Sequence, residues 1–153
     1  MPSSSRPIKS GVCNCGAMRM ASRRLSQMYD AALAPAGLKT TQFGILSVIG
    51  RHADDPPTMR ELADALAMDR STLGQNLGPL ERDGLVAVEP SGADRRRKLV
   101  VLTDEGRARY ARARPLWSRA QERFERTMGT AEAASLRRIL LGIAANSELK
   151  SPG

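Results

Sequence analysis

The stretch from Asp69 to Thr103 constrains the fold of this chain more than any other. Asp69 can cap the first free amides of a helix. Three leucines follow at intervals of four and three residues: Leu73, Leu77 and Leu80. This spacing aligns side chains on one helix face, and Gly84 then supplies a left-handed stop. The sequence therefore predicts a capped helix with one apolar face.

Two short β-rich runs follow that helix, Leu85–Val88 and Leu99–Leu102. Between them lie Pro90-Ser91-Gly92, a turn signal, and then consecutive cations. These cations are Arg95, Arg96, Arg97 and Lys98. A helix followed by a hairpin with a basic tip is typical of a winged helix-turn-helix, in which the hairpin is the wing.

The residues before Asp69 supply the other helix of such a unit. Thr58-x-x-Glu61 is a capping box, and apolar residues follow it at helical spacing. These are Met59, Leu62, Ala63 and Leu66. With Ala67-Met68 as the turn, this helix and the Asp69 helix form the pair that places its second member in the major groove of DNA.

The polar face of the Asp69 helix carries short donors and acceptors suited to base edges and phosphates. These residues are Ser71, Thr72, Gln75 and Asn76, and Arg70 precedes them at the start of the helix. We expect Gln75 and Asn76 to contact adenine in a bidentate manner, and Arg70 and Thr72 to meet phosphates.

The motif at the hairpin resembles the wing signature of the MarR family of transcriptional regulators. It reads Asp94-x-Arg96, five residues, then Leu102-Thr103, with Gly106 three residues further on. The run Leu80–Val86 is similar to that family's exit from the recognition helix, and the looser likeness extends from about Cys15 to Leu141. The resemblance implies a mainly α fold with a small β-hairpin wing, and a homodimeric, ligand-responsive repressor of transcription that is not an enzyme.

Local propensity disagrees with that resemblance at one place. Gly74, Gly78 and Pro79 lie within the proposed recognition helix, where Gly costs about 1 kcal/mol and Pro about 3 kcal/mol relative to Ala. Propensity alone predicts a break at Gly78 and a restart at Pro79. The resemblance implies one helix, continuous or kinked, and we follow it.

The cations of the tip suggest a contact with the minor groove. We expect Arg96 to enter a narrow, A·T-rich minor groove and Asp94 to orient its guanidinium group. Arg95, Arg97 and Lys98 alternate along the strand, so only some of them can face DNA at once. The alternative is a solvated hairpin that binds nothing, or a winged-helix module that binds protein. The basic tip argues against a protein-binding wing, which would expose apolar anchors.

The composition of the chain also favours DNA as the partner. The chain has 153 residues, a formal charge of +8 and only 3% aromatic residues, which favours duplex DNA over stacked single strands. It contains neither a signal-peptide core nor an apolar run of roughly 20 residues. We therefore expect a cytoplasmic protein without a membrane partner.

Helices outside the winged unit have apolar stripes that need a partner. We expect helices over Cys15–Leu33, from Thr103 to Met128 and from Thr130 onward, and a second helix capped by Thr41. The predicted organisation is a flexible basic tail at 1–12, a dimerisation region at 13–36 and 104–147, a DNA-binding region at 41–103 and a flexible tail at 148–153. Two copies paired through the terminal helices would bind a pseudo-palindromic DNA site. The alternative is that these helices pack against one another within a single chain.

Cys15 lies fourteen residues before Tyr29, a spacing similar to that of the organic-hydroperoxide-sensing branch of the family. A thiol at a helix start among arginines can be reactive, which makes Cys15, with Cys13, a candidate redox sensor. The branch's tyrosines are absent, since Arg19, Thr40 and Phe43 stand at their expected places. Inert cysteines are therefore the favoured interpretation.

The sequence also raises the questions of an effector pocket, a metal site and an enzyme activity. Met18, Tyr29, Phe43 and Trp117 could line a pocket for a small aromatic or phenolic effector, of the kind that the family often binds, although plain core residues have the same spacing. His52 is the only histidine, and no metal-ligand spacing accompanies it. A thiol oxidoreductase would need a Cys-x-x-Cys motif that the chain lacks, so we expect no enzyme and no cofactor.

Overall fold

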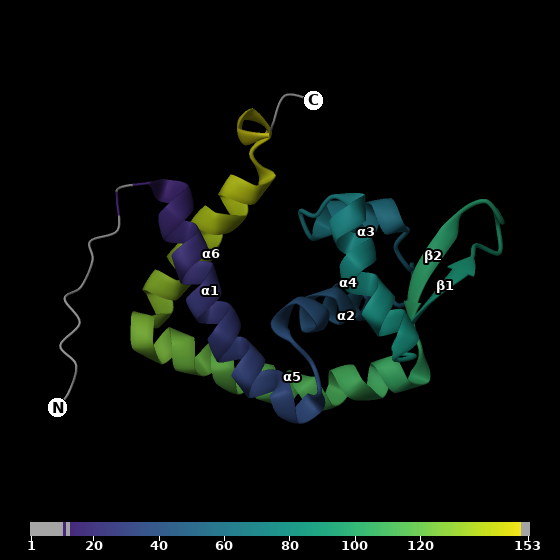
Figure 1. Cartoon of the computed structure of the whole chain (residues 1–153), viewed down its shortest axis with the longest axis horizontal. Coiled ribbons are helices and arrows are strands. Elements are labelled where there is room, and N and C mark those ends of the chain that lie inside the picture. Colours follow the sequence, from purple (N-terminus) through teal and green to yellow (C-terminus); the bar gives the residue numbers. More distant parts are fainter. Residues whose placement is uncertain (1–10, 12, 151–153) are drawn as a thin grey trace.

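A computed structural model describes Gly11 and residues 13–150 of the chain. Helices and one hairpin make up this part (Figure 1). In chain order they are α1 (Asn14–Leu33), the 3-10 turn η1 (Ala34–Ala36), α2 (Thr40–Arg51), α3 (Met59–Ala65), α4 (Arg70–Arg82), β1 (Val86–Pro90), β2 (Lys98–Leu102), α5 (Asp104–Met128), α6 (Thr130–Ala145) and the 3-10 turn η2 (Ser147–Leu149). The predicted fold class, mainly α with a hairpin wing, is confirmed.

The long helix α5 connects two parts of the molecule (Figure 1). Near its start, α2, α3, α4 and the hairpin form the winged unit, and further along it α1 and α6 pack against it. The outer parts of the two groups stand apart above α5, with the hairpin at the far end, while the last turns of α1 meet the start of α2. The surface of α4 and the tip of the wing therefore lie away from the terminal helices.

The hairpin is antiparallel and pairs Val86 with Leu102 at its base and Pro90 with Lys98 at its outer end. The predicted strands were therefore too short at the tip, where Pro90 belongs to β1 and not to the turn. On its other side β2 meets the segment before α3, because Val100 N donates to Pro57 O at 2.8 Å. The wing is thus attached to the start of the helix-turn-helix.

Apolar residues from every element of the winged unit share one core. Leu73, Leu77 and Leu80 of α4 are at most 2% exposed. Because these three side chains are buried together, α4 runs unbroken through Gly74, Gly78 and Pro79. The break that propensity predicts at Gly78 is wrong, and the continuous helix implied by the resemblance is observed.

The helix starts agree with the sequence except at α2. Thr58 and Thr103 cap α3 and α5 through their hydroxyl oxygens. Thr41 lies within α2 and does not cap it, because the N-cap is Lys39, two residues earlier. Asp30 accepts a hydrogen bond from Thr40 N at 2.6 Å, and Gln42 accepts one from Lys39 N at 2.9 Å. The acceptor on Asp30 comes from another helix, which no local pattern reveals.

The predicted tails are only partly within the described residues. The segment 1–12, except Gly11, and residues 151–153 lie outside them. Ser147–Leu149 forms η2, so the helical part of the chain extends slightly beyond the predicted end at 147. None of the helices in the described ranges combines the length and the apolar character of a membrane span.

Candidate DNA-binding surface

The cap of α4 fixes the first turn of the predicted recognition helix. Asp69 Oδ1 accepts a hydrogen bond from Thr72 N at 2.6 Å. This bond to a backbone amide holds the pKa of Asp69 below its usual range, because it stabilises the charged carboxylate. An ionised cap at the positive end of the helix dipole in turn stabilises the turn that presents Arg70, Ser71 and Thr72.

The polar face of α4 is open to solvent as predicted, with one exception. Arg70, Ser71, Thr72 and Gln75 are exposed. Asn76 is half-buried, and its Nδ2 donates to Thr72 O at 2.8 Å. This bond uses one of the two Nδ2 hydrogens and fixes the orientation of the amide, so Gln75 is the less constrained of the two predicted base readers.

The tip of the wing is a tight turn from Asp94 to Arg97. Arg97 N donates to Asp94 O at 3.0 Å, and Arg96 N donates to Asp94 Oδ1 at 3.0 Å. The Asp94 carboxylate therefore orders the backbone of the turn. The prediction that it holds the Arg96 guanidinium is not what the geometry shows, because the bond goes to the main chain of Arg96.

The tip cations do not share one environment. All four are exposed, but only Arg97 has a carboxylate partner in the described part of the chain. Arg97 is held against α3, because its Nη2 lies 3.1 Å from Oε1 and 3.4 Å from Oε2 of Glu61. One of the four predicted DNA-binding cations is therefore paired within the chain.

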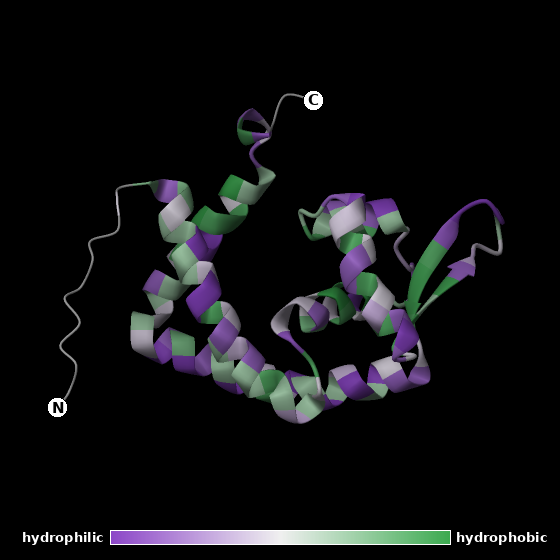
Figure 2. Cartoon of the chain, viewed as in Figure 1, coloured by the Kyte–Doolittle hydropathy of each residue, from purple (hydrophilic) through white to green (hydrophobic). Residues whose placement is uncertain are grey.

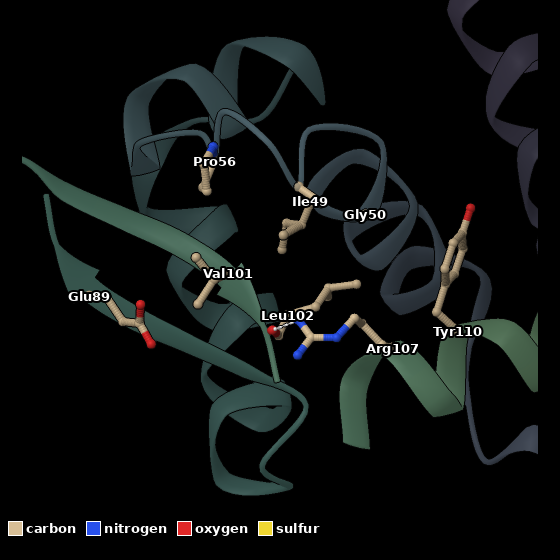
Figure 3. Close-up of a pocket in the computed structure, with 9 residues that line it drawn as sticks. Ile49, Gly50, Pro56, Glu89, Val101, Leu102, Arg107 and Tyr110 are labelled. Carbon is tan, nitrogen blue, oxygen red and sulfur yellow. Dashed lines mark hydrogen bonds between the residues drawn. The ribbon is translucent and has the colours of Figure 1, made fainter. Parts of the chain in front are cut away.

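The base of the wing is anchored on α5. Thr103 Oγ1 donates to Gly84 O at 2.6 Å, and Arg107 Nη1 donates to Leu102 O at 2.7 Å. A Cβ atom on Gly106 would lie 1.9 Å from Leu85 O, so only glycine allows this approach of α5 to the hairpin. Figure 3 shows Arg107 reaching from α5 to Leu102 at the end of β2. Both residues line a hollow of about 390 Å³. The orientation of the wing is thus set by the first turn of α5.

The four predicted effector residues do not meet in one pocket. Phe43 is 6% exposed, and its ring lies 5.7 Å from that of Trp117 in the core of the winged unit. Met18 and Tyr29 instead line a separate, mostly apolar hollow of about 560 Å³ between α1 and α6. The Tyr29 hydroxyl donates a hydrogen bond to Gln121 Oε1 at 2.6 Å. Burial of the hydroxyl and, second, the nearby Glu125 carboxylate raise the pKa of Tyr29.

Both cysteines are exposed free thiols at the start of α1. Cys13 is the N-cap, and its Sγ accepts a hydrogen bond from Gly16 N at 3.4 Å. Cys15 lies in the first turn of the helix. In the described part of the chain, His, Cys, Asp and Glu do not gather in a group of three or more that could hold a metal ion.

Comparison with known proteins decides the family. Residues 36–97 match the model of the MarR family. The crystal structure of the M. tuberculosis transcriptional regulator MosR in complex with DNA is 40% identical, covers 89% of this chain and 96% of that one, and superimposes with a TM-score of 0.77. The chain belongs to the MarR family of transcriptional regulators.

Two further transcriptional regulators resemble this chain. The transcriptional repressor CouR, bound to a 23-mer DNA duplex, is 29% identical over 91% of this chain and 99% of CouR, with a TM-score of 0.78. The transcriptional activatory protein BadR of Rhodopseudomonas palustris is 33% identical, but the match spans only 59% of this chain and 58% of BadR. MarR-family proteins are transcriptional regulators and not enzymes, which removes the oxidoreductase hypothesis.

Two contacts between residues far apart in the chain were not predicted from the sequence. Glu61 was recognised as half of a capping box, but its pairing with Arg97 joins residues 36 positions apart. The bond from Tyr29 to Gln121 spans 92 positions. Neither pair has a periodic or motif signal, because both depend on how separate elements pack.

Proposed function

We propose that this MarR-family protein is a repressor that binds a pseudo-palindromic duplex operator as a homodimer. The observation that carries the proposal is the exposed polar face of α4 together with the exposed tip of the wing, on a fold that aligns with 96% of a DNA-complexed relative. Its repressor character is suggested by CouR, and an activator role is the alternative that BadR represents.

Each part of this surface has a distinct role in the proposed complex. Gln75, with Asn76 and Ser71, reads base edges in the major groove, and Arg70 and Thr72 contact phosphates. Arg96 enters the neighbouring minor groove, where a narrow A·T-rich segment concentrates negative potential. Asp94 serves this contact by ordering the turn, since its carboxylate bonds Arg96 N at 3.0 Å.

A second copy of the chain is expected because α1 and α6 leave apolar side chains in solvent. Met20 is 51% exposed, Ile139 53% and Leu141 63%. In Figure 2 the outer part of α6 is strongly hydrophobic, in contrast to the polar tip of the wing. Pairing through these helices supports a twofold dimer whose two α4 helices meet half-sites about one DNA turn, roughly 34 to 36 Å, apart.

The central experiment removes the charge that is proposed to enter the minor groove. The probe is a duplex selected by the wild-type protein from a random pool. Arg96→Ala should weaken binding and flatten the salt dependence by about 1 unit of slope per protomer. Arg123→Ala, which removes an exposed cation of α5, is the control and should change neither quantity. An unchanged affinity and slope for Arg96→Ala would remove the wing from the mechanism.

The hollow between α1 and α6 is the proposed effector site. Its lining is mostly apolar, and an adjoining hollow of about 270 Å³ shares Tyr29 with it and adds Arg137. An aromatic ring in the apolar part and a carboxylate near Arg137 fit a small aromatic acid, although Glu125 already pairs with Arg137 at 3.2 Å. Salicylate should lower the DNA affinity of the wild type, and a lack of any effect would count against this class of effector.

Regulation by peroxide remains an alternative form of the same function. The exposure of Cys13 and Cys15 favours it, because an oxidant can reach both thiols. A sensor requires that peroxide releases DNA from the wild type but not from Cys15→Ser. Equal behaviour of the two proteins would leave the cysteines inert.

A further inference from the structure

Glu61 holds one of the four tip cations in the free protein. The pair that it forms with Arg97 is half-exposed, with side-chain exposures of 49% for Arg97 and 54% for Glu61. Exposed ion pairs contribute little to stability. The wing does not depend on this pair for its position, since the β2 backbone already bonds to Pro57 and the hairpin is anchored on α5.

The carboxylate of Glu61 is fixed in place by its own helix. Thr58 donates both its backbone N–H and its hydroxyl to Glu61 Oε2, each at 2.8 Å. These two bonds, the backbone one first, hold the pKa of Glu61 below its usual range, so the group stays ionised at neutral pH. Glu61 is therefore a preorganised anion that offers Arg97 the same kind of partner as a DNA phosphate.

We propose that Glu61 is a positioning residue that withholds Arg97 from the DNA backbone and so sets the electrostatic part of DNA binding. The inference rests on the proposed function of the wing. When the wing approaches a duplex, Arg95, Arg96 and Lys98 are available to phosphates, whereas the charge of Arg97 is neutralised within the protein. The pair thus lowers affinity for any duplex, whatever its sequence, because phosphate contacts carry no base information.

Glu61→Gln separates the role of this side chain in the capping box from its ion pair with Arg97. Glutamine retains the capping box, because its amide oxygen can still accept from Thr58 N, but it carries no charge for Arg97. The probe is a duplex of random sequence, and the readout is the slope of log affinity against log salt concentration. Each additional phosphate that a cation neutralises steepens this slope by about 0.9. We expect Glu61→Gln to bind more tightly at low salt and to steepen the slope by about 0.9 per protomer.

Two further variants make the test specific to the pair. Arg97→Gln alone should leave the slope near that of the wild type, and Glu61→Gln combined with Arg97→Gln should return it to that value. Glu89→Gln removes an exposed carboxylate of β1 and controls for the loss of a negative charge on the wing. If Glu89→Gln steepens the slope as much as Glu61→Gln, general repulsion explains the effect and the proposal fails.

The outcomes also distinguish this inference from the proposed function. A wild-type protein that binds no duplex overturns the proposed function itself. A wild type that binds with a clear salt dependence, together with a Glu61→Gln slope that is unchanged or flatter, overturns only the role of Glu61. A flattening by about 0.9 in Arg97→Gln overturns it too, since Arg97 would then already contact phosphate in the wild-type complex.

Discussion

Ala67 adopts a backbone conformation that alanine rarely takes, with φ of 51°. It lies at the end of α3, where Met68 N bonds to Ala63 O at 2.9 Å and Ala67 N to Asp64 O at 3.2 Å. This pair of bonds is the Schellman ending, which normally places glycine at the left-handed residue. The turn of the helix-turn-helix therefore carries strain that the sequence did not reveal, because alanine usually indicates helix.

Replacing Ala67 by glycine should relieve this strain. A left-handed conformation costs an alanine roughly 1 to 2 kcal/mol, which the added flexibility of an unfolded glycine partly offsets. We expect Ala67→Gly to raise the free energy of unfolding by up to about 1 kcal/mol, measured by urea denaturation at a fixed protein concentration. Ala108→Gly, in the exposed interior of α5, is the matched control and should lower it by about 1 kcal/mol. Destabilisation by both changes would contradict the strain at Ala67.

Among the elements, α4 shows what local sequence determines and what packing determines. Its cap at Asp69, its buried leucines and its glycine ending were all predicted, because each depends on residues within the helix or beside it. Its continuity through Gly78 and Pro79 was not predicted by propensity. Burial of Leu73, Leu77 and Leu80 in a core built by other elements stabilises the helix beyond its intrinsic preference.

In the wing, too, local sequence predicts the elements, whereas packing determines the contacts between distant residues. The strands and the basic tip follow from the β-rich runs and the charges. The attachment of β2 to Pro57, and the capture of Arg97 by Glu61, bring together residues far apart in the chain. The sequence therefore indicated that the tip is basic, but not which of its cations is paired within the chain.

The cap of α4 should make the stability of the winged unit depend on pH. The pKa of Asp69 is lower in the folded chain than its ordinary value of about 3.9. Its contribution is therefore fully present above that ordinary value and is lost as the pH falls through the lower folded value. Asp69→Asn keeps a capping oxygen but cannot titrate. The stability difference between wild type and Asp69→Asn, from urea unfolding, should shift against the wild type as the pH falls below the ordinary pKa of an aspartate. A difference that stays constant over this range would show that the carboxylate does not titrate as described.

At the scale of the whole molecule, the exposed apolar residues of α6 predict the assembly. Leu141 is the most exposed of them within that helix at 63%, and an isologous interface contains each such residue twice. Burial of one leucine contributes about 1.5 to 3 kcal/mol. Leu141→Glu should therefore weaken the dimer by at least about 3 kcal/mol, more than a hundredfold in its dissociation constant. Sedimentation of the wild type should give twice the chain mass at micromolar concentration, and Leu141→Glu should give the monomer.

The Leu141→Glu variant also tests whether binding to the operator requires two paired chains. A monomer contacts one half-site, so it loses the second set of contacts that the dimer makes on the same duplex. Leu141→Glu should bind the selected operator far more weakly than the wild type, although its α4 and wing are unchanged. Ala108→Glu places a carboxylate on the exposed surface of α5 and should remain dimeric. A dimeric Leu141→Glu would place the interface elsewhere, and a monomer that binds the operator with full affinity would refute the need for twofold pairing.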